Sequence, residues 1–144
     1  MEKKQLVVVA AIIDDGLGKY LITQRQAGKH LAGKWEFPGG VVEFGEDPDK
    51  RLKIELKQEL GIEAHVFNRI LGYSSYVYEG GMHVILLAFY CVIWGSRLIQ
   101  KIGIQDYKWV TPKEMAKYDF CEADQVFVKK LQKGDLRSGG AYFQ

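Results

Sequence analysis

The sequence contains few of the features that mark disulfide-rich or membrane-spanning proteins. It has two cysteines in 144 residues, Cys91 inside an apolar run and Cys121 after an aromatic residue. Two are too few for a disulfide framework or for a metal-ligand spacing, so we predict buried thiols in a reducing compartment, the cytoplasm. No segment approaches the roughly 20 consecutive apolar residues that a membrane-spanning helix needs. We therefore expect no membrane association.

Charge of one sign is not concentrated anywhere in the chain. The 20 basic and 18 acidic residues are mixed along its length and leave a net charge of +2. Without a basic block, nothing predicts a nucleic-acid polymer as partner. With 47% hydrophobic residues, we expect one domain at 1–134, as a monomer or homodimer. Residues 135–144 are glycine-rich and end like a remnant of protease cleavage, so we expect a flexible tail there.

Strand and turn patterns dominate the first third of the chain. The valine- and isoleucine-rich run 6–13, the turn residues 14–18 and the strand pattern of 19–24 together predict a hairpin. A short strand at 34–37 stops at Pro38-Gly39-Gly40, where the chain must turn sharply. Further strands are predicted near 63–73, 74–79, 83–94 and 106–110, with Gly80-Gly81 as a hairpin turn.

Two helices are predicted, one near the middle of the chain and one near its end. Asp47 followed by Pro48 is typical of a helix start and Gly61 of a helix stop, so the first helix should span about 48–60. Its buried stripe is Leu52, Leu56 and Leu60. Residues 111–114 form a capping box, and the second helix should run from 121 or 122 to 132. This order of elements predicts a mixed sheet between helices, an α/β/α sandwich.

Two carboxylates should lie beside the buried stripe of the first helix. At about 100° per residue, Glu59 and Glu55 fall roughly 20° and 60° from Leu52. The Gly39-Gly40 turn just before the helix can supply outward-pointing carbonyls, and Mg²⁺ prefers such oxygen ligands. An isolated pair of glutamates at this spacing is more often a solvated acidic flank. The pair by itself therefore does not establish a metal site.

The wider spacing favours the metal site. The segment Gly40-x5-Glu46-x7-Ile54-Glu55-Leu56-Lys57-Gln58-Glu59-Leu60-Gly61-Ile62 resembles the Nudix box G-x5-E-x7-R-E-U-x-E-E-x-G-U, where U is bulky and aliphatic, at seven of nine specified positions. The approach from Trp35 is also similar to that of MutT-like Nudix proteins, and the resemblance extends from the first strand to Asp124. It implies a Nudix sandwich and an attack by water on a phosphorus of a nucleoside diphosphate linked to another group.

The resemblance also implies roles for individual residues. Glu55 would bind or orient the attacking water and Glu59 would be a direct metal ligand, both as catalytic residues. The metal-binding residues would be Gly39, through its carbonyl, Glu55, Gln58 and Glu59, with Mg²⁺ as cofactor and Mn²⁺ as a possible substitute. The structural positions of the box would be Gly40, Glu46 and Gly61, and Glu46 would usually pair with the box arginine.

Three departures from the family pattern bear on activity. Ile54 replaces the box arginine, so we expect Glu46 to lose its charged partner. Gln58 replaces the first of two adjacent glutamates and offers a carbonyl oxygen without negative charge. Gly103, six residues before Trp109, stands where MutT relatives often carry a further metal-binding glutamate. Asp106 nearby could substitute for it, unless strand alternation aims it at solvent.

The resemblance places the substrate at four other residues. Arg25 would meet a phosphate or stack on a base, because its guanidinium is planar and permanently charged. His30 and Phe37 match positions near the nucleotide pocket, and Asp124 matches the position that reads the base edge. The alternatives are a surface arginine for Arg25, plain packing for His30 and Phe37, and a helix N-terminal carboxylate for Asp124.

Together these patterns predict a Mg²⁺-dependent nucleotide pyrophosphohydrolase of the MutT-like branch. It would cleave a nucleoside triphosphate to monophosphate and pyrophosphate. The departures keep open a catalytically impaired domain that binds or senses a nucleotide, and a nucleoside diphosphate-sugar hydrolase is a weaker alternative.

Overall fold

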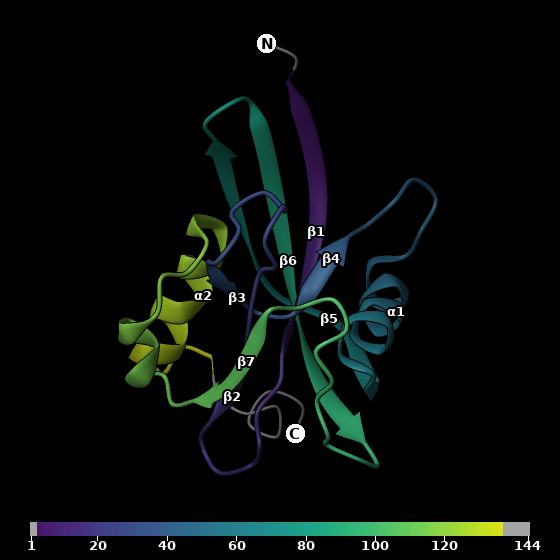
Figure 1. Ribbon diagram of the computed structural model, residues 1–144, viewed down its shortest axis with the longest axis vertical. Helices are drawn as coiled ribbons and strands as arrows, with labels where there is room; N and C mark the ends of the chain where they lie inside the picture. The colour runs from purple at the N-terminus through teal and green to yellow at the C-terminus, as the bar shows by residue number, and fades with distance from the viewer. Residues whose placement is uncertain (1–2, 137–144) are drawn as a thin grey trace.

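The computed structural model describes residues 3–136 and places a four-stranded sheet between two α-helices (Figure 1). In chain order the elements are β1 (Lys4–Ile12), β2 (Tyr20–Gln24), β3 (Trp35–Glu36), β4 (Gly39–Val41), α1 (Pro48–Leu60), β5 (Glu63–Tyr78), β6 (Met82–Trp94), β7 (Asp106–Val110), the 3₁₀-helix η1 (Glu114–Lys117) and α2 (Glu122–Lys133). The predicted α/β/α sandwich is confirmed. None of these helices is both long enough and apolar enough to cross a bilayer.

The larger sheet is mixed, in the order β4-β1-β6-β5. Strand β1 runs parallel to β6 and antiparallel to β4, and β5 pairs antiparallel with β6. A smaller antiparallel sheet has the order β3-β2-β7. Strand β4 pairs with the middle of β1, so the turn between β3 and β4 is held against the sheet. The chain that leads from β4 to α1 therefore begins at a position fixed by the sheet.

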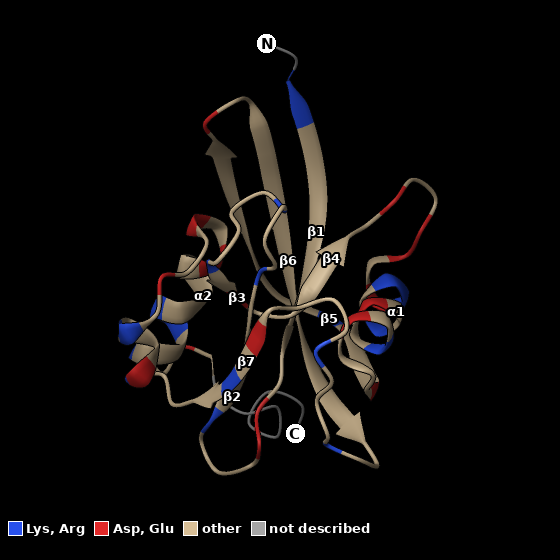
Figure 2. Cartoon of the chain, in the orientation of Figure 1, with Lys and Arg blue, Asp and Glu red and all other residues tan. Residues whose placement is uncertain are grey.

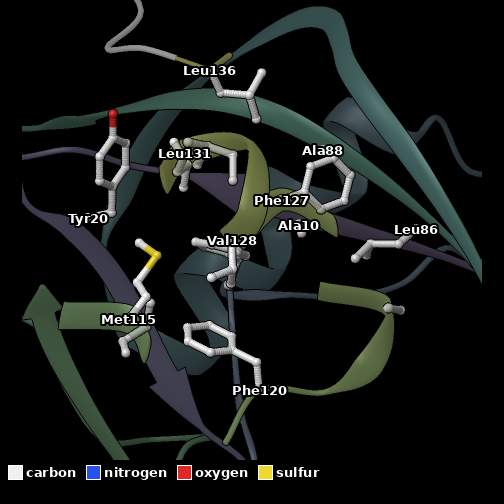
Figure 3. Close-up of a cluster of buried hydrophobic side chains, with 14 of the residues drawn as sticks. Ala10, Tyr20, Leu86, Ala88, Met115, Phe120, Phe127, Val128, Leu131 and Leu136 are labelled. Carbon is white, nitrogen blue, oxygen red and sulfur yellow. The ribbon is translucent and has the colours of Figure 1, made fainter. Parts of the chain in front are cut away.

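Strand β1 separates two apolar cores. Val9 and Ala11 contact the core beneath α1, whereas Ala10 and Ile12 contact the core beneath α2, as the two-residue period of a strand requires. Figure 3 shows the α2 core, with Phe127 packed among side chains from β1, β6 and the C-terminal part of the chain. Both faces of the sheet are therefore covered.

Helix α1 begins and ends where the sequence predicts. Leu52, Leu56 and Leu60 are almost completely buried, and Gly61 ends the helix in the left-handed conformation at φ 68°. Asp47 occupies the N-cap position, but its side chain makes no capping hydrogen bond within the described chain and pairs with Lys50 at 3.3 Å. The start of α1 therefore depends on Pro48 and on packing more than on a cap.

Two predictions about the strands are wrong. Strands β1 and β2 do not form a continuous hairpin, because they belong to different sheets and only the turn near Asp14 and Tyr20 is paired. Residues 63–78 form one long strand instead of two, and register shifts between Val66 and Gly72 absorb the irregularity. The Gly80-Gly81 turn joins β5 to β6 as predicted.

At the C-terminal end, the capping box and the last helix are confirmed with small changes. Thr111 and Glu114 exchange the two capping hydrogen bonds, at 2.9 and 3.2 Å, but the box opens the short η1. Leu136 packs into the α2 core, so packing continues two residues beyond the predicted domain end (Figure 3). The predicted flexible tail at 135–144 lies outside the described residues from 137 onward.

Candidate active site

The two box glutamates lie together at the edge of a charged cavity. Glu55 is 8% exposed, and a Cβ atom added to Gly40 would lie 2.4 Å from its carboxyl carbon. Only glycine at this position leaves room for that carboxylate. Glu59 lies one turn further along α1, and both side chains line the cavity. Figure 2 shows acidic and basic residues on α1 and acidic residues on the loop before it.

The nearby Glu55 carboxylate and burial both act on the pKa of Glu59. Burial raises the pKa of this carboxyl to about 7, and the negative charge of Glu55 contributes in the same direction. Neighbouring carboxylates in a partly buried site repel each other until a proton or a cation lies between them. Their chemistry is therefore that of an oxygen-donor pair suited to a divalent cation.

Backbone from the glycine turn forms another wall of the same cavity. Gly39 and Gly40 belong to β4, and a Cβ atom on Gly39 would lie 1.8 Å from the Val9 carbonyl oxygen of β1. Glycine is therefore required for β4 to approach β1 so closely. This approach brings the turn residues to the flank of α1 that carries the glutamates.

The partner of Glu46 corrects one expectation from the sequence. Glu46 does not lose its charged partner, because Arg51 Nη1 donates to Glu46 Oε2 at 3.4 Å. The same guanidinium donates through Nη2 to Glu55 Oε1. Ile54 is 42% exposed and takes no part in these contacts. The charge missing at position 54 is supplied from the preceding turn of the helix.

The other two departures leave the cavity without a further carboxylate from their positions. Gln58 is exposed and lies outside the cavity lining, so the structure does not bring it to the predicted metal set. Gly103 does line the cavity, and a Cβ atom there would lie 2.8 Å from Glu59 Cγ. Asp106 pairs with Lys101 at 3.2 Å and is not part of the lining, so it does not substitute.

A second, mostly apolar chamber adjoins the charged one. It contains all four predicted substrate residues, and Phe37 forms part of its wall while being 2% exposed. The Phe37 backbone N–H donates to Asp124 Oδ2 at 3.1 Å, and Asp124 is itself 5% exposed. His30 packs edge-on against Tyr78 with ring centroids 5.3 Å apart. The remaining wall includes Leu6, Val8, Met82, Val84 and Leu86.

Arg25 is the only predicted substrate residue already in an ion pair. Its Nη1 lies 3.1 Å from Glu36 Oε1, and its Nε donates to the His30 carbonyl oxygen at 2.6 Å. Sequence reasoning missed Glu36. The signal that could have revealed it is a charged residue between Trp35 and Phe37, because a buried carboxylate requires a cationic partner.

Glu36, Cys121 and Asp124 bring potential ligand atoms within 4.8 Å of one another. Burial raises the pKa of Asp124 well above its ordinary range, and the nearby charge of Glu36 adds to the effect. Burial likewise raises the pKa of the Cys121 thiol. All three residues line the apolar chamber, where Cys121 and Asp124 are buried. Glu55 and Glu59 of α1 line the charged chamber instead.

The two chambers adjoin along a common wall. Their linings share Arg25, Glu36, Gly39, Gly40 and Val41. A molecule with an apolar planar end and a strongly charged end could therefore occupy both chambers at once. The glutamates of α1 would face its charged end.

Comparisons with known proteins agree with this arrangement. The NUDIX domain family model matches residues 8–130, and the chain belongs to the Nudix family. It is 41% identical to the 8-oxo-dGTP diphosphatase of Haemophilus influenzae over 132 residues, covering 91% of this chain and 94% of that protein. It is 38% identical to the CTP pyrophosphohydrolase of Escherichia coli, covering 84% and 87%. The chain is thus a Nudix hydrolase of the MutT type.

Solved structures show the same fold. The solution structure of the E. coli ORF135 protein matches with a TM-score of 0.75 at 34% identity, covering 91% of each chain. The MutT protein from Methanosarcina mazei Go1 matches with a TM-score of 0.80 at 21% identity, covering 95% of this chain and 99% of that one.

Proposed function

We propose that this chain hydrolyses nucleoside triphosphates to nucleoside monophosphate and pyrophosphate, with Mg²⁺ as cofactor. The observation that carries the proposal is that the apolar chamber and the charged chamber adjoin and share lining residues. A base in the apolar chamber would place the phosphates beside Glu55 and Glu59, because Gly39 and Gly40 line both spaces. The names of the two relatives, both enzymes acting on triphosphates, support the same substrate class.

The residues at the charged chamber fit a divalent cation. Glu59 and the Gly39 carbonyl would hold it, and the raised pKa of Glu59 beside Glu55 is the expected behaviour of a carboxylate pair awaiting a cation. When bound, Mg²⁺ would neutralise phosphate oxygens and lower the pKa of a bound water. Glu55 would orient the attacking water and accept its proton, while Gly40 keeps its carboxylate in place.

The phosphate end needs a cation from the protein, and Lys29 is available. Three basic side chains line the charged chamber. Arg25 is paired with Glu36, and Arg51 is paired with Glu46 and Glu55. Within residues 3–136 the Lys29 ammonium group makes no ion pair or hydrogen bond, and its positive charge acts on Glu36 and Glu59 from a longer distance. We assign it to the phosphate chain, where a point charge with three donors can follow a moving group.

The base end is closed by Asp124. Its carboxyl group lies at the apolar chamber, fixed by the Phe37 N–H, and can hydrogen-bond base amino and imino groups. Such a buried polar group discriminates strongly, because an unmatched base leaves it unpaired. Phe37 and His30 would position the base by packing.

The decisive experiment is a nucleotide panel with the purified protein. Nucleoside triphosphates of each base, nucleoside diphosphates and nucleoside diphosphate-sugars are incubated with Mg²⁺ or Mn²⁺, and released pyrophosphate and phosphate are measured. We expect pyrophosphate from triphosphates, loss of turnover with a chelator, and no turnover by Glu59→Gln. Release only from nucleotide sugars would replace the substrate class. No release from any nucleotide, with nucleotides still raising the melting temperature, would favour the impaired binding domain.

A further inference from the structure

The loop before α1 and the catalytic flank of α1 meet at one side chain, Arg51. This residue lies in the second turn of the helix, and its side chain is 20% exposed. One terminal nitrogen donates to Glu46 on the loop, and the other donates to Glu55 on the next turn. A guanidinium can make both contacts because its donors form a rigid planar fork.

Helical spacing explains how position 51 can replace position 54. Residues three and four apart are neighbours on a helix, so Arg51 lies beside both Ile54 and Glu55. Ile54 is 42% exposed, and no described residue needs a charged partner at this position. The basic charge has thus moved by about one turn along the same flank without losing reach to Glu46.

The loop that Arg51 holds is part of the active-site wall. Glu46 Oε1 accepts the Glu43 backbone N–H at 2.8 Å, and the Glu46 N–H donates to the Glu43 carbonyl at 3.1 Å. Glu43 in turn lines the charged chamber. Glu46 therefore uses one oxygen to close the loop and the other to bind Arg51, which connects the loop to Glu55.

Glu55 itself has little freedom in this arrangement. Gly40 packs against one side of its carboxyl group, and Arg51 binds one of its oxygens. A water-orienting carboxylate must be held within a fraction of an ångström, because small misplacements cost about 10²-fold in rate.

We propose that Arg51 is a positioning residue that takes over the task of the missing box arginine, holding Glu46 and Glu55 in their catalytic arrangement. The proposal rests on the proposed function for its kinetic consequences. Its structural part, the link from Glu46 through Arg51 to Glu55, is tested without any substrate.

The kinetic test compares four variants with the wild type. Arg51→Ala should lower kcat by about 10- to 100-fold, the usual cost of removing a partner that orients an active-site ligand. Arg51→Lys should recover only part of the loss, because an ammonium cannot bridge both carboxylates as a fork. The double variant Arg51→Ala, Ile54→Arg should regain most of the rate. Ile54→Arg alone should stay within about twofold of the wild type, since both carboxylates already have a partner.

Mn²⁺ binding, followed by electron paramagnetic resonance, separates positioning from general damage to the helix. Arg51→Ala removes a positive charge beside the cation site, so its Mn²⁺ affinity should be equal to or higher than that of the wild type. A disordered helix would instead lose metal affinity and rate together. Lys50→Ala is the matched control, because it removes a basic residue of the same helix whose partner is the exposed Asp47.

A double-mutant cycle on thermal unfolding completes the test. Arg51→Ala and Glu46→Gln should be less than additive, whereas Lys50→Ala and Asp47→Asn should be nearly additive. A kcat unchanged in Arg51→Ala, a joint loss of rate and Mn²⁺ affinity, or failure of the Ile54→Arg rescue would overturn the proposal. A wild type without turnover would overturn the proposed function and the kinetic role, and the cycle would still decide whether Arg51 links Glu46 to Glu55.

Discussion

Gly40 and Glu55 are in direct contact across the active site, with no space for even one additional carbon atom between them. A Cβ atom on Gly40 would meet the Glu55 carboxyl carbon at 2.4 Å and its Oε1 at 2.7 Å. The box glycine and the box glutamate are fifteen residues apart in sequence, and their constant spacing reflects one packed contact.

Gly40→Ala should therefore inactivate the enzyme without unfolding it. The backbone of Gly40 does not have the positive φ that would forbid alanine, and the atoms that the added Cβ would displace belong to the Glu55 side chain and not to the backbone. We expect a stability loss of about 1–3 kcal/mol and a rate loss of about 10²-fold or more from the shifted carboxylate. Chemical denaturation and pyrophosphate release measure the two effects.

The control for this change is Gly72→Ala, whose Cβ would meet Phe127 at an ordinary 3.4 Å. It should keep wild-type turnover. Equal activity of Gly40→Ala and the wild type would contradict the tight contact.

The raised pKa of Glu59 predicts how pH acts on the metal-free protein. The folded-state pKa of about 7 lies above the ordinary value of 4.5, so the native state binds the proton more tightly than the unfolded chain does. The stabilising contribution is complete below about pH 4.5 and is lost as the pH rises through about 7. Thermal unfolding of the chelator-treated wild type should show this loss of stability between about pH 4.5 and 7. The Glu59→Gln variant, treated in the same way, should not show it.

The same titration predicts the pH dependence of metal binding. A divalent cation must displace the proton on Glu59, so Mg²⁺ affinity should rise with pH and level off above about 7. Calorimetry in buffers of different ionisation enthalpy would detect the released proton. An affinity independent of pH in this range would show that Glu59 is not a ligand.

Lys29→Ala should weaken binding of the phosphate chain. The Lys29 ammonium group makes no ion pair or hydrogen bond within residues 3–136, and its charge acts on Glu36 and Glu59, so it faces the chamber that would hold the phosphates. We expect KM for a triphosphate to rise by about 10-fold, the value of one lost charge-assisted contact of about 1.5 kcal/mol. The effect should shrink for a diphosphate and at high salt. Lys53→Ala, exposed on α1, is the control, and an equal rise in KM for both variants would refute the assignment.

Asp124→Asn should change which base is accepted more than it changes chemistry at phosphorus. The amide keeps the volume and an oxygen for the Phe37 N–H, but it replaces a titratable carboxyl by a fixed donor and acceptor. The ranking of kcat/KM across bases should change, whereas the affinity for the metal ion without nucleotide should stay the same. Asp119→Asn, whose side chain is 76% exposed, should leave the ranking unchanged. An unaltered ranking in Asp124→Asn would place base recognition elsewhere.

Much of the active site could be predicted before any coordinates. The flank of α1 follows from the constant rotation of a helix, so Glu55 and Glu59 had to lie side by side once Leu52 and Leu56 faced the core. The turn residues Gly39 and Gly40 were equally clear, because their chemistry is local. The strand pairing of β1 could not be predicted in this way, because the partner of a strand is determined by contacts distant in sequence.

By itself, then, the sequence determined the family, the helix that carries the glutamates and four of the residues that line the apolar chamber. The tertiary structure alone decided which charges meet, Arg51 with Glu46 and Glu55, and Arg25 with Glu36. It also decided that the Gln58 side chain faces solvent. The physical reason is reach. A helix fixes the direction in which each side chain leaves its axis. A long charged side chain, however, can pair with any group within several ångströms. Those groups come together only when the loop, the turn and the sheet have packed.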